Sequence, residues 1–349
     1  MQHKLHKILP LLAALLIVTA DTASAAKPQS FDADVEKFVS EMNLKYGLGL
    51  NRLRELMGKV TYQQSIIDAI TRPAEAKPWA KYRPIFITPS RIAQGVEFWN
   101  ENTALLERAE QVYGVPAQLI VAIIGVETRY GRNIGKYPVV DALSTLAFGY
   151  PKRAEFFRRE LAQFLLLIQE ERIEPDEALG SYAGAMGLPQ FIPSSYRAYA
   201  VDFDGDGQRD LWHSKADVIG SVAAYFKQHG WKRGGDITTR VSGVESRHDP
   251  FVEAGMKPSF TFGKLRKTGV RSEQPVADDA LASLIRLDGE TEYEHWLGLH
   301  NFYVITRYNH SNLYAMAVYQ LSREILSERG RQAQAENRAE TDSDRLENK

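Results

Sequence analysis

Apolar positions recur at helical spacing through most of this chain. The pattern covers residues 31–56, and a second helix is expected to follow two glycines and end near residue 70. It resumes at residue 91 and holds to about residue 230, with short breaks at glycine and proline. A chain with this pattern is predicted to be mainly α-helical.

Two stretches depart from the helical pattern. Residues 71–90 contain four prolines with aromatic residues between them, which predicts an irregular connector on the surface. After residue 231, short β-branched or aromatic runs at 237–241, 260–262 and 282–287 are separated by turn residues and predict strands. Helix is expected again from about residue 311.

The composition narrows the class of protein. The chain has 349 residues, 44% of them hydrophobic and 25% charged, as in ordinary globular proteins. A formal net charge of −1 argues against nucleic acid as a partner. There is no cysteine, which excludes disulfides, thiolate metal sites and cysteine nucleophiles, and also a lipid anchor on an N-terminal cysteine.

The N-terminus has the layout of a secretory signal. Lys4 and Lys7 precede an apolar run over residues 8–20, and Ala23-Ser24-Ala25 follows. The run is short for a membrane span, although an uncleaved anchor is the alternative. We expect removal of residues 1–25 and a soluble periplasmic protein without a membrane anchor.

A carboxylate stands at the end of the most apolar helix. Residues 119–126 are apolar nearly all round, Pro116 stands at the expected helix start, and Gly131 is the expected left-handed cap. Glu127 therefore lies near the C-terminus of a buried helix, where desolvation and the helix dipole both raise its pKa. A carboxyl protonated near neutral pH can act as a general acid. The alternative is a structural ion pair with Arg129 or another base.

A second motif is rich in glycine and aromatic residues. Residues 180–195 contain Gly184 and Gly187, which let backbone approach a ligand, together with hydrogen-bonding Ser181 and Gln190. Polar groups and flat apolar faces together suit a sugar. A helix–helix turn whose glycines serve packing is the alternative.

These two motifs together resemble the lytic murein transglycosylase B family. Residues 125–131 read Gly-Val-Glu-Thr-Arg-Tyr-Gly, and residues 181–194 run from Ser-Tyr-Ala-Gly-Ala-Met-Gly to Gln-Phe-Ile-Pro-Ser. The resemblance extends over about residues 31–325 through further segments at 147–157, 202–212, 220–231 and 308–314. It implies a lysozyme-like helical core and peptidoglycan glycan strands as the partner, with cell-wall enzyme complexes as further partners.

The resemblance also implies a role for each site residue. Glu127 is the single catalytic acid and base, and Ser181 orients Glu127 or the N-acetyl group of the substrate. Gln190 and Phe191 line the saccharide groove. Lys152 and Arg153 meet peptide stems or carboxylates, and the remaining substrate-binding side chains are Tyr130, Tyr308, Asn309 and Tyr314.

One carboxylate is enough for a lytic transglycosylase. Hydrolytic glycosidases use two carboxyl groups, and Asp141 is the second group that the sequence offers. In the family's reaction the same glutamate protonates the glycosidic oxygen and then deprotonates the C6 hydroxyl of N-acetylmuramic acid, which closes a 1,6-anhydro ring without water. A hydrolytic muramidase and a non-catalytic murein-binding protein are the alternatives.

An acidic loop resembles a calcium site. Carboxylate ligands stand at positions 1, 3 and 5 of an EF-hand-like loop, where they are Asp202, Asp204 and Asp206. Gly207 stands at position 6, and the ligand expected at position 7 is the backbone carbonyl of Gln208. Position 12 is His213 instead of glutamate, and Asp217 from the next helix is expected to supply the missing carboxylate. We therefore predict a structural Ca²⁺ and no cofactor for catalysis. A turn whose carboxylates cap backbone groups is the alternative.

The predicted organisation follows from these motifs and from the pattern. The expected segments are a signal at 1–25, an N-terminal helical region at 26–90, a lysozyme-like core at 91–235 with the acidic loop at 202–217, a small strand-rich insertion at 236–290, a return to the core at 291–327 and a charged tail at 328–349. The tail is expected to be frayed helix or disorder.

Overall fold

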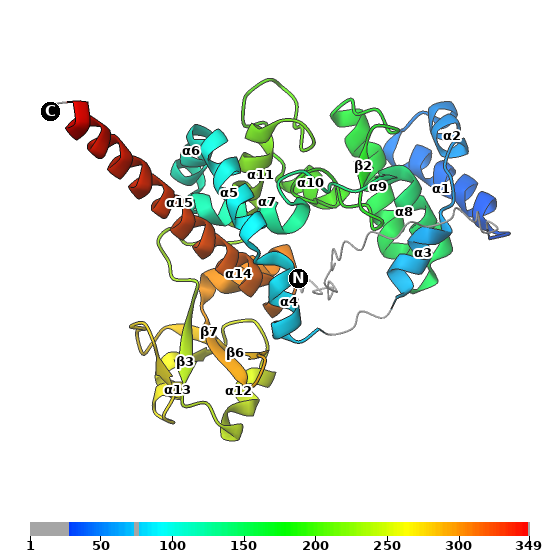
Figure 1. Cartoon of the computed structure of the whole chain (residues 1–349). Coiled ribbons are helices and arrows are strands. Elements are labelled where there is room, and N and C mark those ends of the chain that lie inside the picture. Colours follow the sequence, from blue (N-terminus) through cyan, green and yellow to red (C-terminus); the bar gives the residue numbers. More distant parts are fainter. Residues whose placement is uncertain (1–27, 73–76, 348–349) are drawn as a thin grey trace. The chain divides into compact units, whose positions relative to one another are not determined.

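The computed structural model describes residues 28–72 and 77–347, with side chains up to residue 338. The predicted signal at 1–25 lies outside the described residues. Contacts group these residues into two units (Figure 1). Unit 1 contains residues 77–130 and 222–347, and unit 2 contains residues 28–72 and 131–221. The chain therefore enters each unit twice.

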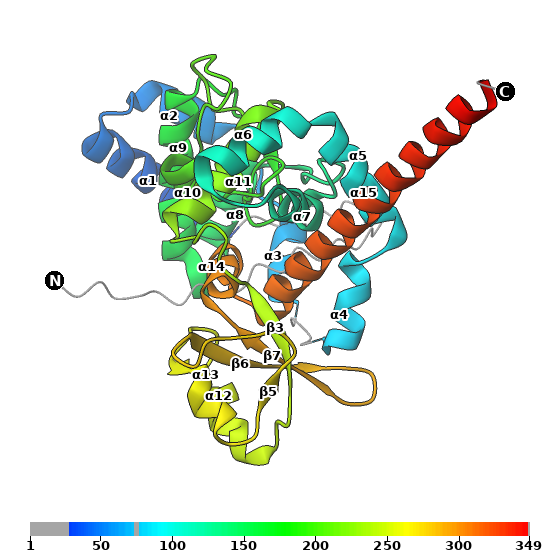
Figure 2. The same ribbon diagram turned by 90° about the vertical axis from the view of Figure 1, so that its left-hand side faces the viewer.

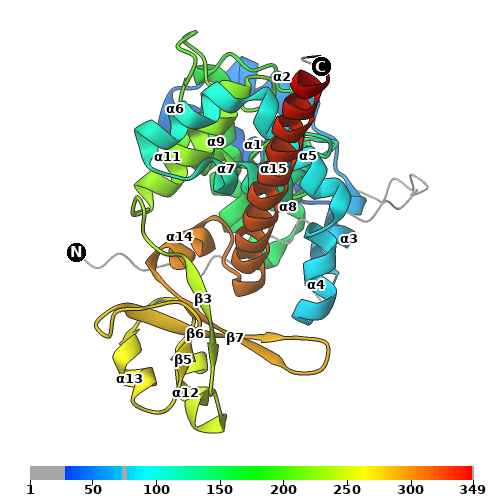
Figure 3. The ribbon, with the colours of Figure 1, turned by 60° about the vertical axis from the view of Figure 1, so that its left-hand side comes forward.

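The helices of unit 1 surround one apolar helix, α7 (Ala117–Thr128), which is buried on nearly every side. Helix α15 packs along α5 and α7 (Figure 3). The other helices in this part of unit 1 are α4 (Trp79–Phe86), α5 (Pro89–Glu101), α6 (Thr103–Tyr113), α14 (His300–Tyr308), α15 (Asn312–Glu347) and the end of α11 (Lys215–Gln228). Within the described residues no single helix is long and apolar enough to cross a membrane, and α6 with α7 passes that test only as a pair bent by 113°.

Unit 1 also holds the strand-rich insertion (Figure 2). Five strands pair antiparallel in the order β4-β6-β7-β3-β5. Leu284 stands opposite Leu297, and both belong to an apolar core that helix α13 completes with Phe262 and Leu265. The elements are β3 (Thr238–Ser242), 3-10 helix η2 (Ser246–His248), α12 (Asp249–Glu253), β4 (Phe260–Thr261), α13 (Phe262–Arg266), β5 (Arg271–Ser272), β6 (Leu281–Asp288) and β7 (Tyr293–Gly298).

The three strands predicted here are confirmed as β3, β4 and β6, with their ends shifted by a few residues. β5 and β7 were not predicted. The sheet extends beyond residue 290, because β7 is the central partner of both β3 and β6.

Unit 2 is built on two long helices, α8 (Val139–Gly149) and α9 (Ala154–Glu170), which pack together. α8 also contacts α1 and α3, so the N-terminal helices cover it (Figure 1). The remaining elements are α1 (Phe31–Tyr46), α2 (Leu50–Gly58), α3 (Gln64–Thr71), the strand pair β1 (Tyr137–Pro138) and β2 (Leu179–Gly180), η1 (Pro151–Arg153), α10 (Pro193–Tyr199) and the first half of α11. The single helix expected to end near residue 70 is therefore two helices, α2 and α3.

The predicted surface connector at 71–90 is wrong between residues 79 and 86. This stretch forms helix α4, and its Trp79, Tyr82 and Phe86 are 1%, 3% and 7% exposed. Pro78 stands just before the helix, where a missing N–H costs nothing, and Pro84 removes only one hydrogen bond near the end. Burial of three large aromatic side chains outweighs that loss.

The charged tail is helical as far as the structure describes it. α15 continues to Glu347, so the structure describes this part of the tail as helix. Arg329 lies 4.8 Å from the centre of the Trp99 ring and donates to Asn100, so the helix is held against α5 at that point. Arg331 pairs with Glu328 one turn earlier, which supports the helix locally.

Candidate active site

Glu127 is the penultimate residue of α7, and the chain turns sharply after it. Arg129, Tyr130 and Gly131 have φ angles of 51°, 60° and 87°, so three consecutive residues are left-handed. The left-handed cap is Arg129, whose N–H donates to Gly125 O, and not Gly131 as predicted. This backbone conformation is unfavourable for Arg129 and Tyr130, so their side chains must hold it.

The side chain of Tyr130 locks this turn onto α5. Its hydroxyl donates to Arg91 O at 2.9 Å, and its ring lies 5.7 Å from that of Phe98. A Cβ atom on Gly95 or Gly125 would come within 2.5 Å of this hydroxyl, so both glycines leave room for it. Because Tyr130 is 7% exposed, the geometry gives it a positioning role in place of the implied substrate contact.

Arg129 is held by α5 as well. Its Nε donates to Gln94 Oε1 at 2.8 Å and a terminal nitrogen donates to Ser90 Oγ at 2.9 Å. Among the described residues no ion pair joins it to Glu127, so the structural ion-pair alternative is not formed there.

Tyrosine side chains surround the Glu127 carboxyl. The Tyr314 hydroxyl donates to Glu127 Oε1, and the Tyr308 ring stacks on that of Tyr314 at 6.5 Å. Burial raises the pKa of Glu127 to about 7, and the hydrogen bond from Tyr314 opposes this rise. Burial and the charge of Glu127 raise the pKa of Tyr308 and of Tyr314 well above the ordinary value. Both phenols therefore stay neutral, and Tyr314 stays a hydrogen-bond donor.

Tyr308 and Asn309 lie where α14 ends and α15 is about to begin. Asn309 O accepts from Ser311 N at 2.7 Å, which shapes the turn that brings Tyr314 to Glu127. The predicted association of Glu127 with Tyr308 and Tyr314 is therefore seen within unit 1, although 187 residues separate Glu127 from Tyr314.

Two tyrosines of this group were missed from the sequence. Burial and the charge of Glu127 raise the pKa of Tyr82 above its ordinary value, which places it near the carboxyl. The ring of Tyr225 lies 4.8 Å from that of Tyr308, and its hydroxyl donates to Arg307 O. For Tyr82 a signal existed, since its spacing from Trp79 and Phe86 is that of one buried helical face.

The glycine-rich loop of unit 2 is held by its own polar groups. Ser181 Oγ accepts from Ala183 N and Ala185 N, at 3.3 and 3.1 Å, and so keeps its proton for a further partner. Gln190 has a φ of 53°, and its Nε2 donates to Ile134 O and Gly187 O at 3.1 and 2.9 Å.

Phe191 lies inside unit 2. It is 2% exposed, and its backbone exchanges two hydrogen bonds with Met186. This burial differs from the groove-lining role implied for its ring and makes Phe191 a support of the loop.

Lys152 and Arg153 lie in the short helix η1 with different surroundings. Lys152 is exposed, whereas the Arg153 guanidinium lies over the rings of Phe156 and Phe157 at 4.3 and 5.2 Å. Burial lowers the pKa of Arg153. Lys152 is thus the more accessible cation of the pair.

Asp141, the second carboxylate that the sequence offers, lies in α8 of unit 2. It is 7% exposed, and its Oδ1 accepts from Thr61 N at 2.9 Å. Burial raises its pKa. This contact gives the carboxyl a structural role, because it ties the segment before α3 to α8.

The acidic loop brings three carboxylates together. One oxygen from each of Asp202, Asp204 and Asp217 lies within 4.8 Å of the others, and Asp217 is 1% exposed. Burial raises the pKa of Asp217, and the nearby charge of Asp204 raises it further. Asp217 therefore lies beside Asp202 and Asp204, and its role as the ligand that position 12 lacks stays a prediction.

The carboxylate of Asp206 does not join this cluster among the described residues. Its Oδ1 accepts from Gln208 N at 2.8 Å, and the backbone carbonyl of Gln208 stays a prediction as a ligand. His213 is turned to Asp210, with its Nδ1 2.9 Å from Asp210 Oδ2. Asp202 also accepts from three backbone N–H groups, so the capping alternative describes part of the loop.

Comparison with known proteins decides the family. The family model described as "Transglycosylase SLT domain" matches residues 30–323. The chain belongs to this family. It is 45% identical over 302 residues to membrane-bound lytic murein transglycosylase B of Escherichia coli (strain K12), covering 84% of this chain and 82% of that protein.

Solved structures of other members have the same fold. Soluble lytic transglycosylase SltB1 from Pseudomonas aeruginosa is 54% identical with a TM-score of 0.81, over 85% of this chain and 99% of that one. The Escherichia coli lytic transglycosylase Slt35, solved in complex with calcium, is 44% identical with a TM-score of 0.78, over 85% and 93% of the two chains. The predicted mainly α, lysozyme-like fold is thus confirmed.

Proposed function

We propose that this chain is a peptidoglycan lytic transglycosylase in which Glu127 is both the catalytic acid and the catalytic base. The observation that carries the proposal is the environment of Glu127, whose pKa is raised to about 7 beside tyrosines that stay neutral. Such a carboxyl can give up a proton and take one back near neutral pH. The name of the Escherichia coli relative supports murein as the substrate.

The proposed reaction needs no second carboxylate. Glu127 protonates the oxygen of the β-1,4 bond between N-acetylmuramic acid and N-acetylglucosamine, and the C1–O bond breaks. The 2-acetamido group of the substrate stabilises the positive charge at C1. Ionised Glu127 then removes the C6 hydroxyl proton as the C6 oxygen bonds to C1, which forms 1,6-anhydromuramic acid and restores the acid.

The other predicted site residues are proposed as sugar and stem contacts. The hydroxyl proton of Ser181 and the amide oxygen of Gln190 suit the N-acetyl and hydroxyl groups of a glycan. Exposed Lys152 suits the carboxylates of peptide stems. Tyr308, Asn309 and Tyr314 shape the surroundings of Glu127.

The test is the product of digestion. Glu127→Gln keeps the shape of the side chain and its acceptor for Tyr314 but removes the titratable proton. We expect murein cleavage to fall by at least ~10²–10⁴-fold, with glycan binding retained. Exposed Glu101→Gln is the control and should cleave normally.

Mass spectrometry of the wild-type digest separates the two reactions. Anhydro ends support the lytic reaction, whereas reducing ends would indicate a hydrolytic muramidase. Cleavage by Glu127→Gln within a few-fold of the wild type would overturn the role of Glu127.

A structural Ca²⁺ is proposed for the acidic loop. Three carboxylates within 4.8 Å repel one another, and carboxylate oxygens are the ligands that calcium prefers. The calcium complex of Slt35 supports the choice of ion. Asp202, Asp204 and Asp217 would hold the ion, which would neutralise their charge and take no part in the chemistry.

Calcium should therefore raise the melting temperature of the wild type. Binding to the folded state alone contributes about 2.7 kcal/mol at a hundredfold excess over Kd. Asp202→Ala should abolish the response, and Asp236→Ala, an exposed aspartate of unit 1, should retain it. Identical melting curves with calcium and with chelator would favour the capped turn.

Export to the periplasm and release as a soluble protein are also proposed. The basic, apolar and Ala-x-Ala layout of residues 1–25 supports export, and the absence of cysteine supports release without a lipid anchor. The Escherichia coli relative is membrane-bound by name. Recruitment by cell-wall enzyme complexes remains part of this proposal.

A further inference from the structure

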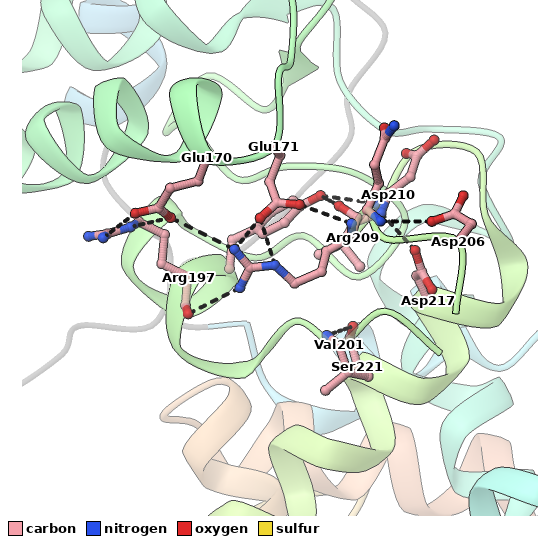
Figure 4. Close-up of polar contacts among 12 residues, drawn as sticks. Glu170, Glu171, Arg197, Val201, Asp206, Arg209, Asp210, Asp217 and Ser221 are labelled. Atoms are coloured by element: carbon pink, nitrogen blue, oxygen red, sulfur yellow. Dashed lines mark hydrogen bonds and ion pairs between the residues drawn. The ribbon is translucent and has the colours of Figure 1, made fainter. Parts of the chain in front are cut away.

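Four residues within the acidic loop contact the glycine-rich loop. We call residues 209–212 the strap. Asp217 accepts from Asp210 N at 2.8 Å with one oxygen (Figure 4). Its other oxygen accepts from Phe203 N at 2.7 Å. A single buried carboxylate thus binds both the start of the acidic loop and the strap.

On its other side the strap is bonded to the glycine-rich loop. Leu211 O accepts from Leu188 N at 2.9 Å, and Trp212 Nε1 donates to Leu179 O at 2.8 Å. A Cβ atom on Gly187 would stand 2.3 Å from Leu211 O, so the two backbones touch. The strap therefore fixes the loop both just before its first residue and at its middle.

The strap itself is anchored to a long helix. Arg209 N and Nε both donate to Glu171, at 3.0 and 2.8 Å, next to the Arg197–Glu170 pair (Figure 4). The Tyr196 hydroxyl donates to Arg209 O and accepts from Leu211 N. Because Arg209 and Leu211 are held in this way, a displacement of the Asp217 carboxylate is transmitted to the glycine-rich loop through Asp210 and Leu211.

We propose that the strap couples cation binding by Asp202, Asp204 and Asp217 to the order of residues 181–191, with Trp212 as the positioning residue. A cation cancels the repulsion among the three carboxylates, so Asp217 keeps its bond to the strap. Without a cation that repulsion loosens the strap and both of its bonds to the glycine-rich loop, from Trp212 Nε1 to Leu179 O and from Leu188 N to Leu211 O. The Trp212 bond seats the strap, so without it Leu211 O is no longer held against Leu188 N. The consequence for sugar binding rests on the proposed function, whereas the coupling does not.

Hydrogen exchange of the full chain without substrate tests the coupling. In the wild type, calcium should slow exchange at Leu188 roughly fivefold or more relative to chelator, as expected for one strengthened hydrogen bond. Trp212→Phe keeps an aromatic ring but loses the Nε1–H donor. It should still bind calcium by titration calorimetry, yet calcium should no longer protect residues 181–191.

The matched control is Trp231→Phe. Trp231 is also buried, and its Nε1 donates to a backbone oxygen, Gly114 O, but in unit 1. This variant should keep the calcium effect on residues 181–191. Calcium protection confined to residues 202–217, protection retained in Trp212→Phe, or no calcium binding by the wild type would each overturn the proposal.

Kinetics extend the test to the proposed sugar site. With excess calcium, Trp212→Phe should raise KM for a soluble murein oligosaccharide roughly fivefold and leave kcat within about twofold. A loss confined to kcat would overturn a positioning role toward the sugar. Loss of the Glu127 assignment would leave the exchange result unchanged, so the two proposals fail separately.

Discussion

Glu127 shares its surroundings with tyrosine side chains, and these decide when its carboxyl carries a proton. Burial favours the neutral acid, whereas the hydrogen bond from Tyr314 favours the carboxylate. The balance gives a pKa of about 7, which leaves both forms populated at neutral pH. A single residue that must be acid in one step and base in the next needs this balance.

The alkaline limb of the pH–activity profile should therefore reflect the pKa of Glu127. Activity should fall as pH rises through about 7, because the protonated acid is lost. Tyr314→Phe removes the donor that stabilises the carboxylate, so the limb should move to higher pH by about one unit, the equivalent of roughly 1.5 kcal/mol. The measurement is kcat/KM against pH, with Tyr319→Phe on the same helix as control. A limb that stays in place or moves to lower pH would contradict this account.

Single residues were predictable where the local sequence sets their surroundings. The position of Glu127 at the end of a buried helix follows from the apolar run before it, and the structure agrees. Tyr130 and Phe191 were themselves predicted as substrate contacts because of the motifs in which they stand, yet both side chains are buried. Neighbourhood in sequence does not show which way a side chain points, because tertiary packing decides that.

At the scale of elements, helix α4 forms because tertiary packing outweighs the low helix propensity of its sequence. Four prolines in twenty residues favour an irregular chain, but one face of α4 carries Trp79, Tyr82 and Phe86 at helical spacing. Contacts with α15 bury that face. The helix therefore depends on a partner that lies more than two hundred residues away in sequence, which local patterns do not report.

Truncation of the buried face should then cost far more than truncation of the exposed one. Trp79→Ala should lower the free energy of unfolding by about 3–5 kcal/mol, as for other buried aromatic residues. Ile85→Ala, on the same helix but 37% exposed, should cost less than about 1 kcal/mol. Guanidinium denaturation followed by circular dichroism measures both. Equal losses would mean that α4 is not held by its aromatic face.

For the whole molecule, the order of helices and strands along the chain was more predictable than their division between the two units. The helical stretches and the strand-rich insertion follow from periodicity, but unit 1 and unit 2 each combine segments far apart in the chain. Glu127 and Tyr314, separated by 187 residues, meet inside unit 1. The resemblance to a known family linked these positions, and periodicity alone had no means to do so.

Processing of the N-terminus is a property of the whole chain that intact mass can test. Signal cleavage requires small residues at the last and third-last positions before the cut, which here are Ala25 and Ala23. We expect the exported wild type in the soluble periplasmic fraction with a mass that begins near residue 26. Ala25→Gln should block cleavage and keep the protein in the membrane fraction with residues 1–25 attached. Ser24→Gln changes the position between them, where size is not restricted, and should be processed normally. A wild-type mass that includes residues 1–25, with the protein in the membrane pellet, would show that the apolar run is an anchor.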